Sequence, residues 1–281
     1  MLEKRKELRK EFFSVGLTNN KKGMFFTLLA IVLVSIFVVS YTIISNLSER
    51  RTIEKRVGTL NDFVELVEED LERKMYISGF RIIFLLEKQI IESGNFIDNF
   101  NESFQEAFFN GSIGGTPQEL MNGAKFSDIQ QDLINKAAKV NANLNLSNAE
   151  IFVTQEDPWN VKVTLSADFF VEDKAELALW NKSLTVSAFV PIEKFGDPFY
   201  AVNTNSLVFN NFTRSPYTSF VSGSDVSNLL SHATNSYYAA STSAPSFLDR
   251  LQGINTANAN GIESLVNLQE LSSRGISVQQ K

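Results

Sequence analysis

Asn-x-Ser/Thr triplets are the most frequent sequence in this chain that carries chemistry. Each is an acceptor sequence for N-linked glycosylation, which marks a surface loop of a secreted or external domain. One triplet alone is a weak match, because a chain rich in Asn and Ser produces some by chance. Six of them, all after residue 45, predict sugar attachment and an extracellular location in an organism that glycosylates. Their asparagines are Asn46, Asn101, Asn110, Asn145, Asn181 and Asn211.

Carboxylates near turns are the next candidates for chemistry. Asp197 stands in a Gly-Asp-Pro sequence, which favours a turn in which Asp bonds nearby backbone amides and Pro fixes φ. Asp168 and Asp173 are expected at or near strand ends, with no motif that positions a substrate. The sequence has no phosphate loop, dinucleotide fingerprint or Gly-x-Ser-x-Gly motif. We therefore predict no catalytic residue and no enzymatic activity.

Composition also limits metal and thiol chemistry. The chain has no Cys and a single His, His232, so thiol nucleophiles and thiolate metal sites are excluded. The sequence around His232, "LLSHATN", offers no acidic partner within a helical turn, and we expect this side chain at the surface. Calcium loops of the D-x-D-x-D-G type do not occur. We predict no metal site and no cofactor.

The segment from Met24 to Ile44 determines most of the functional interpretation. Of its 21 residues 17 are apolar, and no charge occurs between Lys22 and Glu49. At about 1.5 Å per residue a helix of this length spans ~30 Å, the thickness of a bilayer's hydrocarbon core. The segment is a signal peptide, a permanent anchor or the packing helix of a filament subunit. An ordinary signal peptide has about 7–15 apolar residues and then a small-residue cleavage site. No such site follows here, which favours an uncleaved signal anchor with a transmembrane helix over residues 24–45.

The charges on either side of this segment predict its orientation in the lipid bilayer. Residues 1–23 carry seven Lys or Arg and three Glu, whereas the rest of the chain carries 19 basic and 29 acidic residues. A basic tail suits the cytoplasmic side and its anionic leaflet. An acidic domain does not suit nucleic acid as a partner. We predict a single-pass protein of the cell membrane, with a cytoplasmic leader or tail over residues 1–23 and an extracellular C-terminal domain.

Helical periodicity continues after the apolar segment, over residues 46–147. Apolar residues recur at steps of three and four from Ile53 to Met75, which indicates an amphipathic helix. This helix either continues the anchor or begins anew after Gly58, capped by Asn61 or Asp62. "GFRIIFLLEKQII" is apolar on most faces and is expected to be the most buried helix of the outer domain.

A further helix is expected to restart at "TPQEL" and to continue to about Val140. Thr116 would cap it and Pro117 would occupy its first position.

Alternating apolar and polar residues replace this pattern over residues 148–215. The strands "AEIFVTQ", "NVKVTLSADFFV" and "LALWNKSLTVSAFVPI" are separated by turns at "EDPWN" and "EDKAE". This pattern predicts an antiparallel meander with one buried face. The expected fold class is therefore α+β: a single N-terminal transmembrane helix continues into a long amphipathic helix packed on a small antiparallel β-sheet.

The remaining residues, 216–281, form a Ser/Thr/Asn-rich segment and a final helix. Residues 215–260 contain three charged residues, Asp225, Asp249 and Arg250. The scattered aromatic residues either anchor an irregular segment on the sheet, which is the favoured interpretation, or form a contact surface for carbohydrate or protein. The final helix is expected over residues 262–272.

The order of these segments resembles that of archaeal type IV pilin-like surface proteins. "KKGMFFTLLAIVLVS" looks like a class III signal sequence, in which cleavage follows the glycine, here Gly23, and leaves Met24 as the mature N-terminus. Leu28 stands at the fifth mature position, where many members carry Glu. "VPIEKFGDPFYAVNT" resembles an I-E-G-x-x-DP-hydrophobic-Y segment of such proteins, with Lys194 in place of Gly. "SFLDRLQG…GIESLVNL" resembles another recurring element.

The resemblance implies an apolar helix that first anchors the subunit and then packs in a filament core. We therefore expect a non-enzymatic, membrane-anchored cell-surface glycoprotein that is a pilin-like envelope structural or minor filament component. Its partners would be other pilin-like subunits or the pilus or secretion machinery. The alternative is a monomeric, membrane-anchored extracellular module for binding or adhesion that does not polymerise.

Overall fold

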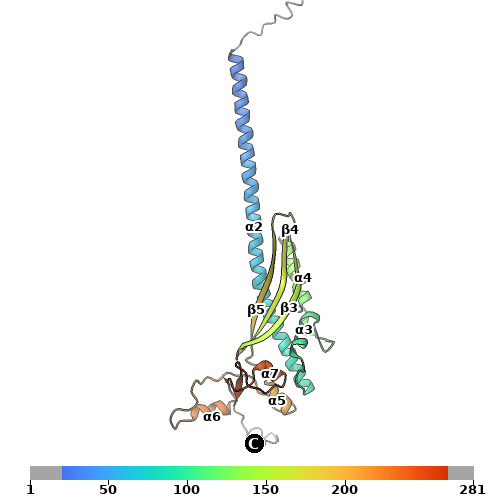
Figure 1. Ribbon diagram of the computed structural model, residues 1–281, viewed down its shortest axis with the longest axis vertical. Coiled ribbons are helices and arrows are strands. Elements are labelled where there is room, and N and C mark those ends of the chain that lie inside the picture. The colour runs from blue at the N-terminus through green and yellow to red at the C-terminus, as the bar shows by residue number, and fades with distance from the viewer. Residues whose placement is uncertain (1–20, 265–281) are drawn as a thin grey trace, which may run out of the picture. The chain divides into compact units, whose positions relative to one another are not determined.

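The computed structural model describes residues 21–264 and divides the chain into two compact units, Met1–Thr59 and Leu60–Lys281. The described chain is of the α+β class, with one long helix and small antiparallel sheets (Figure 1). Most of the predicted cytoplasmic leader and most of the predicted final helix lie outside the described residues.

One helix, α2 (Lys21–Ser93), contains both the apolar segment and the amphipathic sequence after it. It passes through Gly58 without a break, so a second helix capped by Asn61 or Asp62 does not form. In the apolar segment the hydroxyl groups of Thr27, Ser35 and Thr42 donate to carbonyl oxygens three or four residues earlier, at 2.6–2.9 Å. These hydroxyls are therefore satisfied inside the helix.

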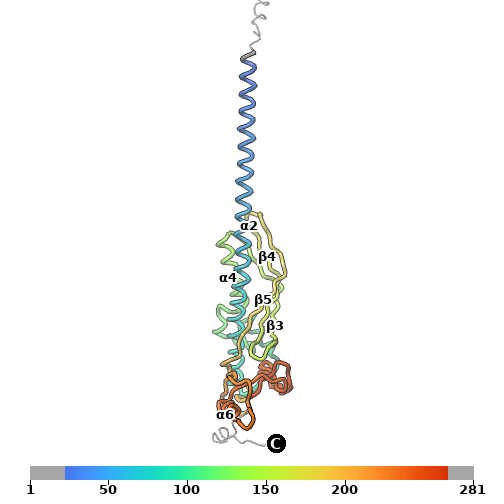
Figure 2. Tube along the Cα trace, turned by 90° about the vertical axis from the view of Figure 1, so that its left-hand side faces the viewer, coloured from blue at the N-terminus to red at the C-terminus, as the bar shows by residue number. Residues whose placement is uncertain are grey.

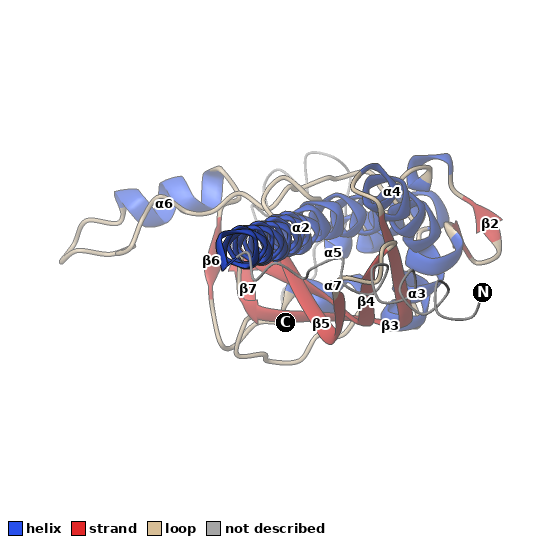
Figure 3. Cartoon of the chain, turned by 90° about the horizontal axis from the view of Figure 1, so that it is seen from above, coloured by secondary structure: helices blue, strands red, loops and turns tan. Residues whose placement is uncertain are grey.

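From Leu60 onward α2 supplies the core of the second unit. The stretch "GFRIIFLLEKQII" is the most buried part, as expected, but it belongs to α2 and is not a helix of its own. Gly79 lies against the sheet, because a Cβ atom there would meet Val163 Cγ2 at 2.9 Å and Val190 Cγ2 at 3.1 Å. The absence of a side chain lets the helix backbone approach two strands closely. Figures 2 and 3 show the strands alongside this part of α2. The buried apolar residues are Leu60, Phe63, Val64, Val67, Leu71, Met75, Ile82, Ile83, Leu85, Leu86 and Ile90.

Two helices and a hairpin follow α2. Helix α3 (Phe100–Asn110) leads into strands β1 (Ser112–Ile113) and β2 (Thr116–Pro117), a short 3-10 helix η1 (Glu119–Met121), and helix α4 (Phe126–Lys139). The prediction of a helix that starts at Thr116 is wrong. The carboxylate of Glu106 accepts hydrogen bonds from Ser112 Oγ and from the backbone N–H groups of Gly114 and Gly115, at 2.7–3.0 Å. These bonds hold residues 112–117 as a hairpin.

The main sheet has the order β3-β4-β5 and is antiparallel, with strands β3 (Ala142–Asp157), β4 (Asn160–Asp173) and β5 (Leu179–Pro191). The two predicted turns and the buried face are confirmed. Strand β3 begins earlier than expected, because Ala142, Leu144 and Leu146 already alternate with exposed asparagines. Helices α2 and α4 lie on the same side of the sheet (Figure 3). The buried positions of β4 and β5 include Val161, Val163, Leu165, Ala167, Phe169, Leu184, Val186, Ala188 and Val190.

The last part of the described chain consists of short elements joined by loops. Strands β6 (Tyr238–Ala240) and β7 (Ile262–Ser264) form an antiparallel pair. The predicted final helix is wrong at its start, because residues 262–264 pair with residues 238–240 as a strand. Figures 1 and 3 show α6 (Ser227–Thr234) on a loop that projects away from the main sheet. The elements are α5 (Pro198–Asn203), α6 (Ser227–Thr234), β6 (Tyr238–Ala240), α7 (Phe247–Leu251) and β7 (Ile262–Ser264).

Candidate functional site

The apolar segment of α2 is exposed along its whole length. Every residue from Gly23 to Ile44 is exposed, and none of the most apolar 18-residue stretch is buried. Among the described residues α2 is the one helix that is long and apolar enough to cross a membrane, and its most apolar 18-residue stretch has a mean hydropathy of 2.6. Exposed apolar area on this scale is costly in water.

The candidate processing residue, Gly23, lies in the first turn of α2. Its carbonyl oxygen accepts a hydrogen bond from Thr27 Oγ1 at 3.2 Å. The residue is exposed, and cleavage after it stays a prediction.

The six glycosylation candidates lie on different elements of the fold. Asn46 lies in α2, two lie in α3, one lies in each of β3 and β5, and Asn211 lies in a loop. All six side chains are exposed. Access for a modifying enzyme is thus available at each, and sugar attachment stays a prediction.

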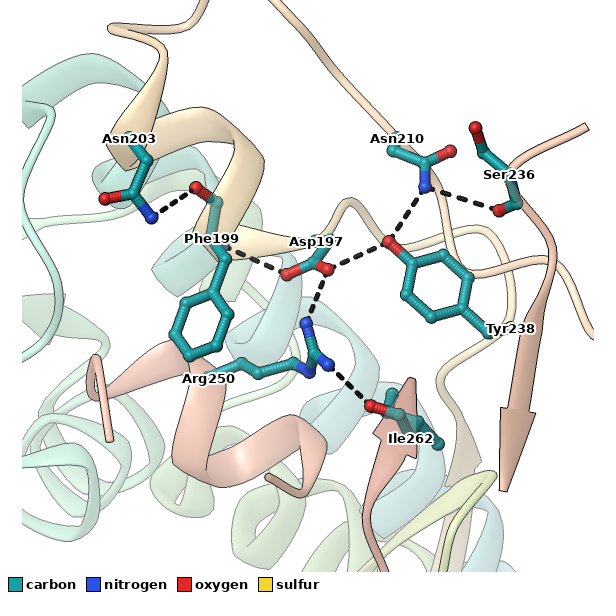
Figure 4. A network of polar contacts seen from close by, with 8 residues as sticks. All are labelled: Asp197, Phe199, Asn203, Asn210, Ser236, Tyr238, Arg250 and Ile262. Atoms are coloured by element: carbon teal, nitrogen blue, oxygen red, sulfur yellow. Dashed lines mark hydrogen bonds and ion pairs between the residues drawn. The ribbon is translucent and has the colours of Figure 1, made fainter. Parts of the chain in front are cut away.

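Asp197 follows a turn at residues 193–195 and is the N-cap of α5, so the Gly-Asp-Pro sequence begins a short helix rather than forming the predicted turn. Its Oδ1 accepts a hydrogen bond from the backbone N–H of Phe199 at 3.0 Å, and Pro198 occupies the first turn of α5. Sequence reasoning missed what surrounds it. Its side chain is 1% exposed, and Oδ2 lies 2.7 Å from Arg250 Nη1 and 2.8 Å from the Tyr238 hydroxyl (Figure 4). We call Asp197, Tyr238 and Arg250 the Asp197 cluster.

The Asp197 cluster joins three segments that are distant in the sequence. Arg250 on α7 also donates to the carbonyl oxygen of Ile262 at the start of β7, and Asn210 Nδ2 donates to the Tyr238 hydroxyl at 2.9 Å. Burial, followed by the nearby Asp197 charge, raises the pKa of Tyr238 far above its usual range. A buried ion pair whose members have further hydrogen bonds holds its segments in one arrangement.

The two short sequences that carry the later part of the pilin-like resemblance meet at this cluster. "VPIEKFGDPFYAVNT" supplies Asp197, and "SFLDRLQG" supplies Arg250. A signal for the contact was present, because Arg250 is the only Lys or Arg between residues 215 and 260. A single basic residue in an aromatic-rich segment with only two other charges, Asp225 and Asp249, indicates a buried ion pair.

Helix α2 reaches the same segment through Glu87. Its Oε1 accepts a hydrogen bond from the backbone N–H of Gly196 at 2.7 Å. A Cβ atom at Gly196 would lie 2.7 Å from that oxygen, so a side chain there would require the Glu87 carboxylate to shift. Burial raises the pKa of Glu87 to about 7. A second acidic group therefore adjoins the Asp197 segment and changes its charge near neutral pH.

No protein-family model, curated protein or solved structure matches this chain. Any functional assignment therefore depends on its own residues.

The expected surface position of His232 is wrong. The residue is 3% exposed, and its ring packs edge-on against Phe220 with centroids 4.6 Å apart. Burial lowers the pKa of His232, and within the described residues its Nδ1 has no hydrogen-bond partner. Helix α6 turns this side chain toward the aromatic residues of its own loop, a contact that the local sequence does not reveal.

The two aspartates of β4 differ in their surroundings. Asp168 lies in the interior of the strand, so its expected position near a strand end is wrong; it is exposed and accepts a hydrogen bond from Asn148 Nδ2 at 2.7 Å. Asp173 ends the strand, is 1% exposed, and accepts weak bonds from backbone N–H groups of the following turn. The structure does not bring either residue to the Asp197 cluster.

Proposed function

We propose that this chain is a non-enzymatic, membrane-anchored cell-surface protein, pilin-like in plan, that serves as an envelope structural or minor filament component. The observation that carries the proposal is the exposed apolar segment, Met24–Ile44. It continues without a break into the part of α2 that forms the core of an α+β unit. A helix that is apolar on all sides requires lipid or other helices around it.

Charge and accessible sequons support an outward position for the second unit. The residues after Gly23 carry an excess of acidic groups, and the residues before Met24 carry an excess of basic groups. This distribution favours a cytoplasmic N-terminus. The sequon asparagines of the second unit are all exposed.

A row of exposed apolar side chains on the second half of α2 supports assembly with other subunits or with pilus or secretion machinery. Leu66, Ile77, Phe80 and Phe84 are 39–61% exposed and recur at helical spacing on one face. Their ridge is suited to packing against another apolar helix or sheet.

The second candidate function is a monomeric, anchored module for binding or adhesion. The projecting loop around α6 favours it, because this loop exposes Val221, Val226 and Leu230 by 51–66% and contains one charged residue, Asp225, between residues 215 and 235. An exposed apolar loop apart from the core is suited to contact with a partner.

The test is the intact mass and N-terminal sequence of the protein extracted from its native membranes. A start at Met24 is expected for a pilin-like subunit processed after Gly23, and Gly23→Val should block that processing. A start at Met1 or Leu2 would favour the monomeric module. Release of the wild-type protein from membranes by alkaline carbonate would contradict both forms of the proposal.

A further inference from the structure

Two of the six sequons occupy equivalent positions on the outer face of the main sheet, which is the face opposite α2 and α4. Asn145 on β3 and Asn181 on β5 are both paired with the same residue of the central strand, Phe170 on β4. The hydroxyl residues of the two sequons, Ser147 and Ser183, are likewise both paired with Asp168. The sheet register thus places the two sequons in two cross-strand rows, one formed by Asn145, Phe170 and Asn181 and the other by Ser147, Asp168 and Ser183.

All side chains of these rows point to the outer face. Along β3 and β4 the buried and less buried positions alternate, and Leu144, Leu146, Phe169 and Val171 are the buried neighbours. Both asparagines are exposed, and Phe170 is partly exposed. Directly opposed residues have Cβ atoms about 5 Å apart, so each asparagine adjoins the phenylalanine ring. The two asparagines themselves lie on strands ~10 Å apart.

We propose that Asn145 and Asn181 both carry N-linked sugars, and that the first sugar of each chain packs on the ring of Phe170 between them. The apolar C–H face of a pyranose ring fits a flat aromatic side chain, and burying the exposed part of Phe170 is favourable. Two sugar chains separated by one ring would cover the outer face of this sheet. The proposal rests on the outward position of the second unit proposed above.

The attachment step requires a lipid-linked sugar phosphate as donor and a transferase of the cell. A bond forms between the asparagine Nδ2 and the anomeric carbon of the sugar, and the bond from that carbon to the phosphate oxygen breaks. The amide nitrogen passes one proton to a base of the transferase, and the lipid phosphate leaves with the electron pair of the broken bond. At Asn145 it is the amide oxygen, not Nδ2, that receives a 3.4 Å contact from Gln130 Nε2, so this contact does not occupy the nitrogen that would accept the sugar.

The sequons on α3 provide an internal comparison. Asn101 and Asn110 are exposed on a helix, where no cross-strand aromatic residue adjoins them. Sugars there would extend into solvent, whereas sugars at the sheet sequons would be held against the protein surface.

Glycopeptide mass spectrometry of the native membrane protein tests attachment. Sugar on both Asn145 and Asn181 is expected. Sugar at Asn101, Asn110 or Asn211 alone would overturn the inference and leave the outward position intact. Sugar at no site would also overturn it, and protection of the second unit from protease added outside intact cells would then separately test the outward position.

Packing on Phe170 is tested by a comparison of melting temperatures. Phe170→Leu should lower Tm more in the glycosylated protein than in the double variant Asn145→Gln/Asn181→Gln, which carries no sugar at these two sites. The expected difference is about 2–4 °C, which corresponds to about 1 kcal/mol from the contacts between the sugars and the ring. Phe152→Leu is the matched control, because Phe152 is exposed on the same face and its opposed residue is Thr164. Equal losses of Tm for Phe170→Leu with and without the sugars would overturn the packing.

Discussion

The two halves of α2 have the same backbone conformation and opposite surroundings. The first half, Met24–Ile44, is apolar on every side and exposed along its whole length. The second half, Leu60–Ser93, is apolar mainly on the sides that face the sheet and the neighbouring helices, and these side chains are buried. The sheet and helices of the same chain therefore cover the apolar side chains of the second half. The first half requires an apolar environment from outside the chain, which we propose to be lipid or neighbouring subunits.

Arg250→Ala should give the largest effect and should act on the second unit alone. It leaves the Asp197 carboxylate buried without its cation, and removal of one member of a buried pair lowers the free energy of unfolding by about 3–5 kcal/mol. Thermal unfolding of the purified protein measures this loss. Arg214→Ala is the matched control, because Arg214 is exposed and stacks on Trp159 at 5.2 Å. Equal effects of the two substitutions would contradict a structural role for the cluster.

Val34→Arg should affect only the first half of the helix. A charge at the centre of a membrane-spanning helix costs about 2.5–3.5 kcal/mol on insertion scales. We expect a smaller fraction of the protein to remain in membranes after carbonate extraction, with unchanged Tm of the second unit. Val34→Leu should behave as wild type. Full retention of the arginine variant would count against membrane insertion of this segment.

Gly79 and Gly58 should respond in opposite ways to a side chain. Gly79→Leu pushes atoms into Val163 and Val190 and should lower the free energy of unfolding by about 1–3 kcal/mol. A Cβ atom at Gly58 would meet no other atom within 4 Å, so Gly58→Ala should stabilise the helix by roughly 0.5–1 kcal/mol. Chemical denaturation measures the first effect, and helicity by circular dichroism measures the second. Destabilisation by Gly58→Ala would indicate a break in the helix at this residue.

Glu87 should make the stability of the second unit depend on pH. Its folded-state pKa is about 7, above the ordinary 4.5, so the stabilising contribution is present below pH 4.5 and is lost as pH rises through 7. We expect a loss of about 1–2 kcal/mol, reduced from the full linkage value because the group is partly solvated.

Glu87→Gln keeps an oxygen acceptor for Gly196 and should remove this pH dependence. The buried His232 gives the opposite pH dependence of stability. Because its pKa is lowered in the folded state, the fold loses stability as pH falls below the ordinary His pKa of 6.5. The difference between the unfolding curves of wild type and Glu87→Gln at several pH values isolates Glu87. Parallel curves would show that Glu87 does not titrate in this range.

Sequence patterns predicted the parts of the fold that depend on local periodicity. The helix over Met24–Met75 and the buried face of the sheet follow from spacings of three to four and of two residues. The hairpin at Thr116 was not predictable, because it depends on the Glu106 carboxylate rather than on turn residues alone. The pairing of Asp197 with Arg250 was also missed, because it joins residues 53 apart in the sequence. Contacts of this kind depend on the assembled fold, which local propensity does not encode.

The close approach at Gly79 has a mechanical consequence. Side chains from two different strands, Val163 and Val190, occupy the space where any other residue would place its Cβ atom. Sliding the helix along the sheet by one turn, about 5.4 Å, would bring a larger side chain into that notch. A pull along the helix axis would therefore meet a steric stop at Gly79 before it could shear the helix from the sheet.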